Sequence, residues 1–426
     1  MATPFWYNAA LALIKPLYKS KIKKRAESTE QFQQECLERF GPFQPVKNRQ
    51  AIWFHVVSVG ETNAAQPLIE HYLKAGHPVL VTNTTKTGQA RAKSLFLKAP
   101  YLDLFQAVYL PADQKPLVRQ FFALYQPKLL ALVETELWPN LIAQAGQSQV
   151  PCILINARLS EKSAKGYAKV SSLTQPMLHG IDQLLAQDQA TAERFIQLGA
   201  APSVTQVVGS IKFDIHAPES FVKQAVQLKK EWSLVGRKII TIASTHAPEE
   251  QKLLSALKPY LDTQPEMLCI AVPRHPERFD EVFNITQSLN LNTTRRSTGQ
   301  RIEADTQVYL ADSMGEMWLW YALSDACFVG GSLNEPGGGH NILEPIALHV
   351  PTVLGKNYFN FQTIVDEFVQ ADAVKVVDDA EQAAALLMTL LEDTEQANTL
   401  NQAAQKIMQL NTGSLKKHIQ VIDAYL

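Results

Sequence analysis

Three glutamates in the first half of the chain follow apolar runs, where carboxylates at strand ends could do acid–base chemistry. Glu61 stands at a strand-to-helix turn, and Glu134 and Glu136 stand where the run KLLALVE ends. A carboxylate at the carboxyl end of a parallel strand lies at the ligand-binding edge of the sheet, where it can act as a general base. The sequence leaves two roles for Glu61 equally open, a general base and a charge that stabilises the following helix N-terminus.

We expect at most one of Glu134 and Glu136 to reach a substrate. The other acid could simply start the next helix, which has Pro139 near its first turn. A lysine, Lys212, follows the last strand of this half in the segment GSIKFD. A loop lysine is usually solvated, but at the mouth of a cleft it is a candidate contact for an anion.

Residues suited to a phosphate occur in the second half. Pro273 and Arg274 follow one predicted strand, and the segment Met314, Gly315, Glu316 opens a helix whose backbone N–H groups face any anion. A glycine-rich loop at 337–339 then leads through His340 into Asn341, Ile342, Leu343 and Glu344. Such a loop is often only a flexible turn. Here, however, an asparagine offers donors to a phosphate, and a glutamate one turn later offers the acceptor that fits a ribose diol.

Two absent motifs narrow the class of ligand. Where a dinucleotide fold carries Gly-x-Gly-x-x-Gly, only Gly60 is present, which argues against NAD. No Asp-x-Asp occurs in the sequence, so the usual carboxylate pair for a diphosphate-bound Mg²⁺ is missing. A leaving group with a single phosphate could instead be held by helix N-termini, Arg274 and Lys212. The sequence therefore predicts a nucleotide-monophosphate sugar as donor and neither a metal nor a cofactor.

These residues are placed by β-rich runs that alternate with amphipathic stretches, a pattern typical of βαβ units on parallel sheets. The predicted strands of the first series are 51–59, 78–84, 107–110, 128–134, 150–156, 183–187 and 204–210. Those of the second series are 237–244, 267–272, 306–310, 326–330, 351–355 and 373–377, followed by a helical tail over 380–425. We expect an α/β protein with two Rossmann-like domains facing a cleft, at 41–215 and 216–426, after an N-terminal segment at 1–40.

The N-terminal segment is apolar over 5–18 and is followed by five cations: Lys19, Lys21, Lys23, Lys24 and Arg25. A secretory signal places its cations before the apolar stretch, so export is disfavoured. Fourteen residues fall short of the roughly 20 that span hydrocarbon. Cations beyond one end suit a positive-inside orientation or an interfacial anchor on anionic lipid, that is, a monotopic or single-anchor attachment. The alternative is an ordinary terminal helix with a solvated basic end.

Composition excludes several classes of protein. With 46% hydrophobic and 19% charged residues the chain can form a large core, and it lacks the signature of disorder. Forty basic against 41 acidic residues leave no overall positive field for nucleic acid. The four cysteines form no Cys-x-x-Cys pair, and three sit in apolar runs, which favours buried thiols in a reducing compartment.

The ordered blocks of the chain resemble the Kdo transferases of lipopolysaccharide assembly, which are inverting glycosyltransferases of the two-domain GT-B type. The blocks that carry the resemblance are SVGET, ETELWPN, NARLS, GSIKFD, PRHPERF, MGE, FVGGS and GGHN-x-LEP. One difference is an extra glycine at 337–339, with Ile342 where the family usually has proline. The rival classes, a nucleotide-sugar epimerase and an exported two-domain binding protein, explain the N-terminal segment less well.

The resemblance implies a reaction and a set of site residues. The family transfers 3-deoxy-D-manno-oct-2-ulosonic acid (Kdo) from CMP-Kdo to the 6′ hydroxyl of a lipid A precursor (lipid IVA), at the cytoplasmic face of the inner membrane. Glu61 matches the proton acceptor of the family, and Glu134 and Lys212 match groups that stabilise the transition state. The CMP contacts are matched by Pro273, Arg274, Met314, Gly315, Glu316, Asn341, Ile342, Leu343 and Glu344.

Overall fold

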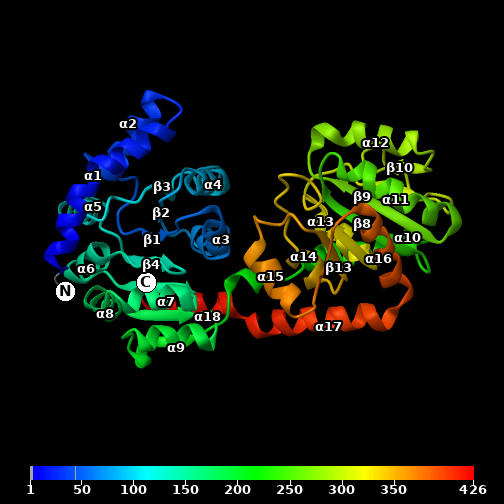
Figure 1. Ribbon diagram of the computed structural model, residues 1–426. Coiled ribbons are helices and arrows are strands. Elements are labelled where there is room, and N and C mark those ends of the chain that lie inside the picture. The colour runs from blue at the N-terminus through cyan, green and yellow to red at the C-terminus, as the bar shows by residue number, and fades with distance from the viewer. Residues whose placement is uncertain (1–2, 44) are drawn as a thin grey trace. The chain divides into compact units, whose positions relative to one another are not determined.

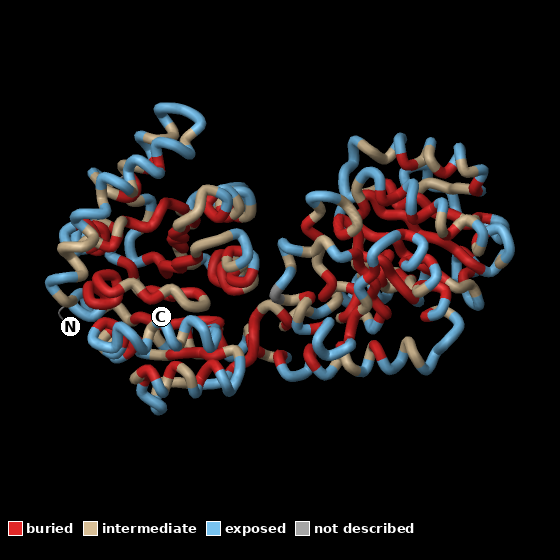
Figure 2. The backbone as a smooth tube through the Cα atoms, viewed as in Figure 1, coloured by how far each residue is buried: buried red, intermediate tan, exposed pale blue. Residues whose placement is uncertain are grey.

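The computed structural model describes residues 3–43 and 45–426, and of residue 363 the backbone alone. The chain forms two compact units (Figure 1). The first unit contains residues 1–214 and 411–426, and the second contains 215–410. In both, the central strands are buried and most exposed residues lie on the surrounding helices, loops and edge strands (Figure 2). The predicted fold of two Rossmann-like α/β domains is confirmed.

The first unit contains a parallel seven-stranded sheet in the order β3-β2-β1-β4-β5-β6-β7. Near-continuous apolar runs form its central strands, as expected for a sheet covered by helices on both faces. Its strands are β1 (Ile52–His55), β2 (Val79–Asn83), β3 (Phe105–Tyr109), β4 (Leu129–Val133), β5 (Cys152–Ala157), β6 (Gln183–Ala186) and β7 (Thr205–Val207). Its helices are α1 (Phe5–Arg25), α2 (Thr29–Phe40), α3 (Val59–Lys74), α4 (Lys86–Phe96), α5 (Lys115–Tyr125), α6 (Pro139–Gln147), α7 (Glu161–Ala168), α8 (Ser171–His179), α9 (Gln189–Gln197), η1 (Pro202–Val204), η2 (Ile211–Phe213) and α18 (Ser414–Asp423).

The second unit repeats this architecture with the parallel order β10-β11-β9-β8-β12-β13-β14. Its strands are β8 (Lys238–Thr245), β9 (Met267–Pro273), β10 (Thr293–Arg295), β11 (Val308–Leu310), β12 (Ala326–Val329), β13 (Thr352–Gly355) and β14 (Lys375–Val377). Its helices are α10 (Glu219–Glu231), α11 (Glu249–Thr263), η3 (Pro276–Arg278), α12 (Phe279–Ser288), α13 (Met317–Leu323), α14 (Leu343–Ala347), α15 (Gln362–Gln370), α16 (Ala380–Glu392) and α17 (Thr394–Asn411).

Each sheet has one point where successive connections run to opposite sides. In the first sheet β1 lies between β2 and β4, and in the second sheet β8 lies between β9 and β12. Ligands of open α/β sheets bind at the carboxyl ends of the strands that flank such a switch point. The loops that follow β1, β4, β8 and β12 are therefore the places to look for chemistry.

The second unit ends earlier in the chain than the sequence predicted. Residues 411–426 belong to the first unit, although 216–426 was expected to form the second domain. The reason is packing, because Ile422 of α18 is buried in the core of the first unit. The hydroxyl of Tyr72 also donates to Asp423 at 3.0 Å, and the backbone N–H of Asn156 donates to His418 Nε2 at 3.0 Å.

The N-terminal segment is helical and is attached to the first unit rather than separate from it. Tyr7 in α1 donates to the buried Asp113 at 2.8 Å, and the Asn140 amide in α6 donates to Asn8 at 3.0 Å. Farther along α1, Arg25 forms an ion pair with Glu35 of α2. Within residues 3–43 and 45–426, no helix is both long enough and apolar enough to cross a bilayer.

Candidate active site

The first candidate half-site lies at the switch point of the first sheet. Glu61 is in the first turn of α3, directly after β1, and Glu134 and Glu136 are in the loop that follows β4. Because β1 and β4 are hydrogen-bonded neighbours, their carboxyl ends bring these three acids together. The sequence alone predicted that Glu61 follows one strand and that Glu134 and Glu136 follow another. It did not predict that the two strands are neighbours.

Glu61 is held by a capping box at the start of α3. The Ser58 hydroxyl oxygen accepts from the Glu61 backbone N–H, and the Glu61 carboxylate accepts from the Val57 N–H at 2.7 Å and from the Ser58 hydroxyl at 3.1 Å. Burial raises the pKa of Glu61 to about 8, and the charges of Glu136 and Glu134 contribute to the rise. Glu61 therefore does cap α3. The same hydrogen bonds hold its carboxyl, which has a raised pKa, at the switch point.

Glu134 and Lys212 form an ion pair. The chain turns sharply after β4, with a φ of 62° at Glu134, and Lys212 comes from the short helix η2 that follows β7. Their Nζ–Oε1 distance is 2.6 Å, and both side chains are mostly buried. Asn156 supports η2, because its side-chain oxygen accepts from the backbone N–H of Ile211 at 3.1 Å. Lys212 is therefore fixed beside Glu134 by this ion pair and is not solvated, as most loop lysines are.

Glu136 also lies at this half-site, where its charge acts on Glu61. It does not start the next helix, because α6 begins at Pro139 with Trp138 as its preceding residue. The Trp138 indole N–H donates to Glu136 Oε2 at 3.0 Å, and His55 Nε2 lies 3.7 Å from the same oxygen. His55 is fully buried at the end of β1, and its Nε2 atom makes no hydrogen bond within the described part of the chain. The sequence analysis missed this histidine because it lies inside an apolar strand.

The second candidate half-site lies at the switch point of the second sheet, in the loops that follow β8 and β12. Glu249, at the start of α11, is buried and accepts from the backbone N–H groups of Gly331, Ser332 and Leu333 at 2.7 to 2.9 Å. Burial raises its pKa despite these donors. A β-carbon on Gly330 would lie 2.7 Å from the Thr245 Cα, so only glycine allows the two loops to approach this closely. Glu249 was not identified from the sequence, although it follows His246 by three residues.

Two histidines meet in this half-site. His246 Nε2 and His340 Nε2 are 2.8 Å apart with their rings stacked, and the His275 ring lies edge-on to His246 at 4.9 Å. Burial lowers the pKa of His340 to about 4, and the positive charges of the neighbouring histidines and Arg274 add to this effect. Burial also lowers the pKa of His246, so both imidazoles of this contact favour the neutral form beside Arg274. Such a pair suits a bound anion, which would favour protonation.

The predicted CMP contacts are divided between exposed side chains and buried ones. Arg274 is exposed and its backbone N–H donates to the Thr245 carbonyl, which fixes the loop after β9 to the loop after β8. Asn341 donates to Glu344 at 3.3 Å and accepts from the Leu343 N–H at 3.1 Å. Burial raises the pKa of Glu344, and Arg274 is close enough to oppose the shift. Arg274, Asn341 and Glu344 therefore belong to one cluster.

Pro273, Ile342 and Leu343 have buried side chains, so only their backbone atoms are available to a ligand. Met314 and Gly315 precede α13, and Glu316 lies at its N-cap position, as the sequence predicted for this segment. Glu316 is already paired, since Arg296 donates to it at 2.8 Å and the Ser313 hydroxyl also donates. Arg296 was not identified from the sequence because it lies between two short strands in an irregular polar segment.

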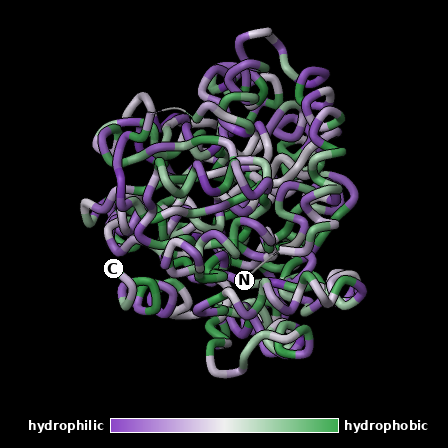
Figure 3. The backbone as a smooth tube through the Cα atoms, turned by 90° about the vertical axis from the view of Figure 1, so that its left-hand side faces the viewer, coloured by the Kyte–Doolittle hydropathy of each residue, from purple (hydrophilic) through white to green (hydrophobic). Residues whose placement is uncertain are grey.

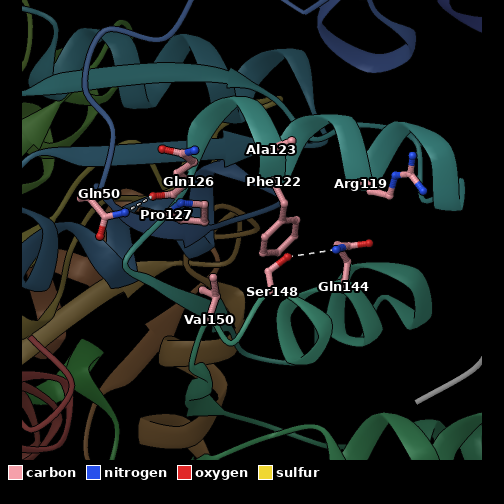
Figure 4. A pocket seen from close by; sticks show the side chains of 9 residues that line it. All are labelled: Gln50, Arg119, Phe122, Ala123, Gln126, Pro127, Gln144, Ser148 and Val150. Carbon is pink, nitrogen blue, oxygen red and sulfur yellow. Dashed lines mark hydrogen bonds between the residues drawn. The ribbon is translucent and has the colours of Figure 1, made fainter.

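A pocket of about 490 Å³ lies between α5 and α6, away from these residues (Figure 4). Its lining includes Gln50 and Pro127, which precede β1 and β4. It is therefore at the amino ends of the strands, whereas Glu61 and Glu134 are at the carboxyl ends. Nothing in its lining matches the predicted chemistry.

Known proteins show strong similarity to both units. Residues 34–215 match the family model described as "3-Deoxy-D-manno-octulosonic-acid transferase (kdotransferase)", and residues 288–407 match "Glycosyl transferases group 1". A 3-deoxy-D-manno-octulosonic acid transferase of Haemophilus influenzae is 34% identical, over 99% of this chain and 98% of that protein. Its counterpart from Bordetella pertussis is 33% identical, over 99% of both chains.

A solved structure covers the second part of the chain. The C-terminal CMP-Kdo binding domain of WaaA from Acinetobacter baumannii is 61% identical, over 45% of this chain and 100% of that domain, with a TM-score of 0.45.

The two parallel sheets and the matched families define a two-domain glycosyltransferase of the GT-B type. The matched families, and not the fold, argue against the rival interpretations of an epimerase and a binding protein, because both family models describe transferases. On the full-length identity to its relatives, the chain belongs to the family of 3-deoxy-D-manno-octulosonic acid transferases.

Proposed function

We propose that the chain transfers Kdo from CMP-Kdo to the 6′ hydroxyl of a lipid A precursor, with inversion at the anomeric carbon. The observation that carries this proposal is the half-buried Glu61 at the switch point, held by Val57 and Ser58, beside the Lys212–Glu134 ion pair. The choice of donor is supported by the 61% identity to a domain described as CMP-Kdo binding. The proposed product is an intermediate of lipopolysaccharide core assembly.

The first unit activates the acceptor. A primary alcohol is a weak nucleophile until a base takes its proton, and Glu61 is a carboxyl whose basicity suits that task near neutral pH. Val57 and Ser58 hold the carboxylate oxygens in place, so little reorganisation is needed as the proton moves. Lys212 and Glu134 place a fixed positive and negative charge beside the reacting centre, where they stabilise the transition state.

The second unit holds the leaving group. CMP departs as a phosphate monoester, and Arg274 and the His246–His340 pair meet its growing negative charge. Glu344 is available to accept hydrogen bonds from the ribose, and Met314 to Glu316 with the backbone of Pro273, Ile342 and Leu343 complete the predicted nucleotide contacts. Direct attack opposite the leaving group inverts the anomeric centre without a covalent intermediate.

The proposed reaction is tested with the full chain, CMP-Kdo and an acylated lipid A precursor, followed by mass spectrometry of the acceptor. We expect the acceptor to gain the mass of at least one Kdo unit and CMP to be released in equal amount. Replacing CMP-Kdo by a UDP-sugar should give no product. Transfer from the UDP-sugar alone would show that the donor is wrongly assigned.

We predict that chelation leaves this transfer rate unchanged. Among the described residues, no group of three or more His, Cys, Asp or Glu side chains is arranged to hold a metal ion. The negative charge of one leaving phosphate is within the reach of protein donors. The measurement is the initial rate with and without EDTA. Loss of activity in EDTA that Mg²⁺ restores would contradict the prediction.

We further propose that α1 binds the anionic, cytoplasm-facing surface of the inner membrane. Exposed apolar side chains, Phe5, Leu13 and Leu17 among them, precede the exposed cations Lys21, Lys23 and Lys24 on the same helix. Each basic residue near an anionic surface contributes about 1 kcal/mol, so replacing these three lysines by glutamine should weaken vesicle binding roughly a hundredfold. The measurement is sedimentation with anionic and with neutral vesicles.

The matched control replaces three lysines of α10, Lys223, Lys229 and Lys230, by glutamine. This variant has the same net charge but leaves α1 intact, so we expect it to bind anionic vesicles like the unmodified chain. Equal loss of binding in the two triple variants would mean that overall charge, and not α1, attracts the protein to the surface.

A further inference from the structure

An apolar pocket of about 110 Å³ lies between α1 and the body of the first unit. Leu11 and Ile14 of α1 form one side and Phe40 of α2 another, and Leu110 and Trp138 close it from the loops after β3 and β4. α1 runs along the edge of the first unit (Figure 1). Figure 3 shows the protein from that side, and hydrophobic and hydrophilic stretches alternate along the backbone there.

Most of the pocket lining is apolar, and two charged groups in its wall, Arg39 and Asp113, are already paired. The Arg39 guanidinium donates to Glu35 at 2.7 Å and to the Thr84 carbonyl at 2.6 Å. The Asp113 carboxylate accepts from the Tyr7 hydroxyl and from the Leu141 N–H, both at 2.8 Å. The surface left to a ligand is therefore mostly carbon. Concave apolar surfaces of this kind bind apolar groups in preference to water.

The outer side of the pocket is continuous with exposed apolar surface. Ile14 lines the pocket and is itself 52% exposed, and Leu13 and Leu17 beside it are 77% and 70% exposed. Two cations lie here, because Lys15 Nζ is 5.4 Å and Lys19 Nζ 5.0 Å from the centroid of the Phe40 ring. Apolar side chains next to cations are the complement of a lipid that carries both acyl chains and negative charge.

The inner wall of the pocket is shared with the first half-site. Trp138 lines the pocket with its ring and donates its indole N–H to Glu136 at 3.0 Å. The same Glu136 oxygen lies 3.7 Å from His55, and the charge of Glu136 acts on Glu61. Trp138 and Glu136 therefore link the wall of the apolar pocket to the half-site of Glu61, which would receive the sugar hydroxyl.

We propose that this pocket binds the end of an acyl chain of the acceptor lipid while its sugar headgroup lies at Glu61, with Trp138 between the two. The proposal rests on the proposed function, and it adds a chain-binding site to the headgroup site. Its consequence is selectivity, because an acceptor with an acyl chain of suitable length binds more tightly than the bare sugar.

The test compares two water-soluble acceptors in detergent-free buffer, a phosphorylated disaccharide with one short acyl chain and its deacylated form. Each is titrated calorimetrically into the unmodified full chain and into Leu11→Trp, in which the larger side chain fills the pocket. Leu410→Trp is the matched control, because the same substitution falls on an exposed leucine of α17, in the second unit. Transfer from CMP-Kdo to each acceptor is assayed in parallel.

We expect Leu11→Trp to weaken binding of the acylated acceptor about tenfold, the effect of leaving roughly two methylene groups in water. Binding of the deacylated acceptor should not change, and Leu410→Trp should resemble the unmodified chain with both. Equal affinity of the unmodified chain for the two acceptors would overturn the proposal even if both are substrates. Tight, Leu11-dependent binding without transfer would support the pocket and contradict the proposed function.

Light scattering of the same samples identifies a different occupant. If the unmodified chain is dimeric and Leu11→Trp is monomeric, a second copy of the chain fills the pocket, and the acyl-chain proposal is wrong. A monomer in all three proteins, with the acyl-dependent difference in affinity, supports it.

Discussion

Glu61→Gln should abolish most of the transfer while leaving the nucleotide site intact. Glutamine has the shape of glutamate and its amide oxygen can still accept from the Val57 N–H, but it cannot take the proton of the acceptor alcohol. Loss of a general base costs about 10²–10⁴-fold. We therefore expect kcat to fall within this range in a transfer assay, with the affinity for CMP unchanged by calorimetry.

Glu70 provides the control for this variant. It lies on the same helix, α3, and its side chain forms an i,i+4 ion pair with Lys74, 3.6 Å apart. Glu70→Gln should have the kcat of the unmodified chain. A folded Glu61→Gln protein with near-normal turnover would show that the capping box is the whole role of this residue.

The second large effect is expected at Lys212. Lys212→Met removes the positive charge that pairs with Glu134 at 2.6 Å, and it leaves that carboxylate mostly buried without its partner. Removing one preorganised group that stabilises a transition state costs about 10²–10³-fold in kcat. We expect a decrease of this size, and Lys212→Arg, which keeps the charge, should recover part of it.

A double-mutant cycle separates catalysis from packing at this pair. Because Lys212 and Glu134 act as a unit, Lys212→Met combined with Glu134→Gln should lose less activity than the product of the two single effects. The unfolding midpoint in urea is measured for all three variants. Fully multiplicative losses would mean that the two residues act independently, contrary to the ion pair.

Much of the fold follows from the alternation of apolar runs with amphipathic stretches. Every strand except β10 overlaps a predicted run, because buried parallel strands are continuous in Val, Ile and Leu. β10 is the short, half-buried edge strand Thr293–Arg295. Its residues are two threonines and an arginine, so the sequence has no apolar run there. Likewise no local pattern could show that α18 returns to the first unit, since that depends on long-range packing around Ile422.

The site was predictable in its residue types and less so in its geometry. Ser58-x-x-Glu61 is a capping-box sequence, so the hydrogen bonds of Glu61 were within reach of local rules. Its raised pKa was not, because it arises from burial and from acids that follow a different strand. The same holds for the pairing of His246 with His340, which are 94 residues apart. The raised pKa of Glu61 and the contact between the two histidines both depend on which strands are neighbours in the sheets.

The pH dependence of kcat/KM tests the assignment of Glu61 as the base most directly. The carboxyl has a raised pKa of about 8, so it is protonated and inactive below that pH and becomes an active carboxylate above it. Glu136→Gln removes a charge that contributes to the raised pKa, and should move the midpoint to lower pH. The residual rate of Glu61→Gln should show no such step.

The measurement is kcat/KM for transfer at saturating CMP-Kdo between about pH 6 and about pH 9, for the unmodified chain and these two variants. We expect a rise of about tenfold per pH unit below pH 8 and a plateau above it in the unmodified chain. A flat profile in the unmodified chain, or the same rise in Glu61→Gln, would contradict the assignment of Glu61 as the base.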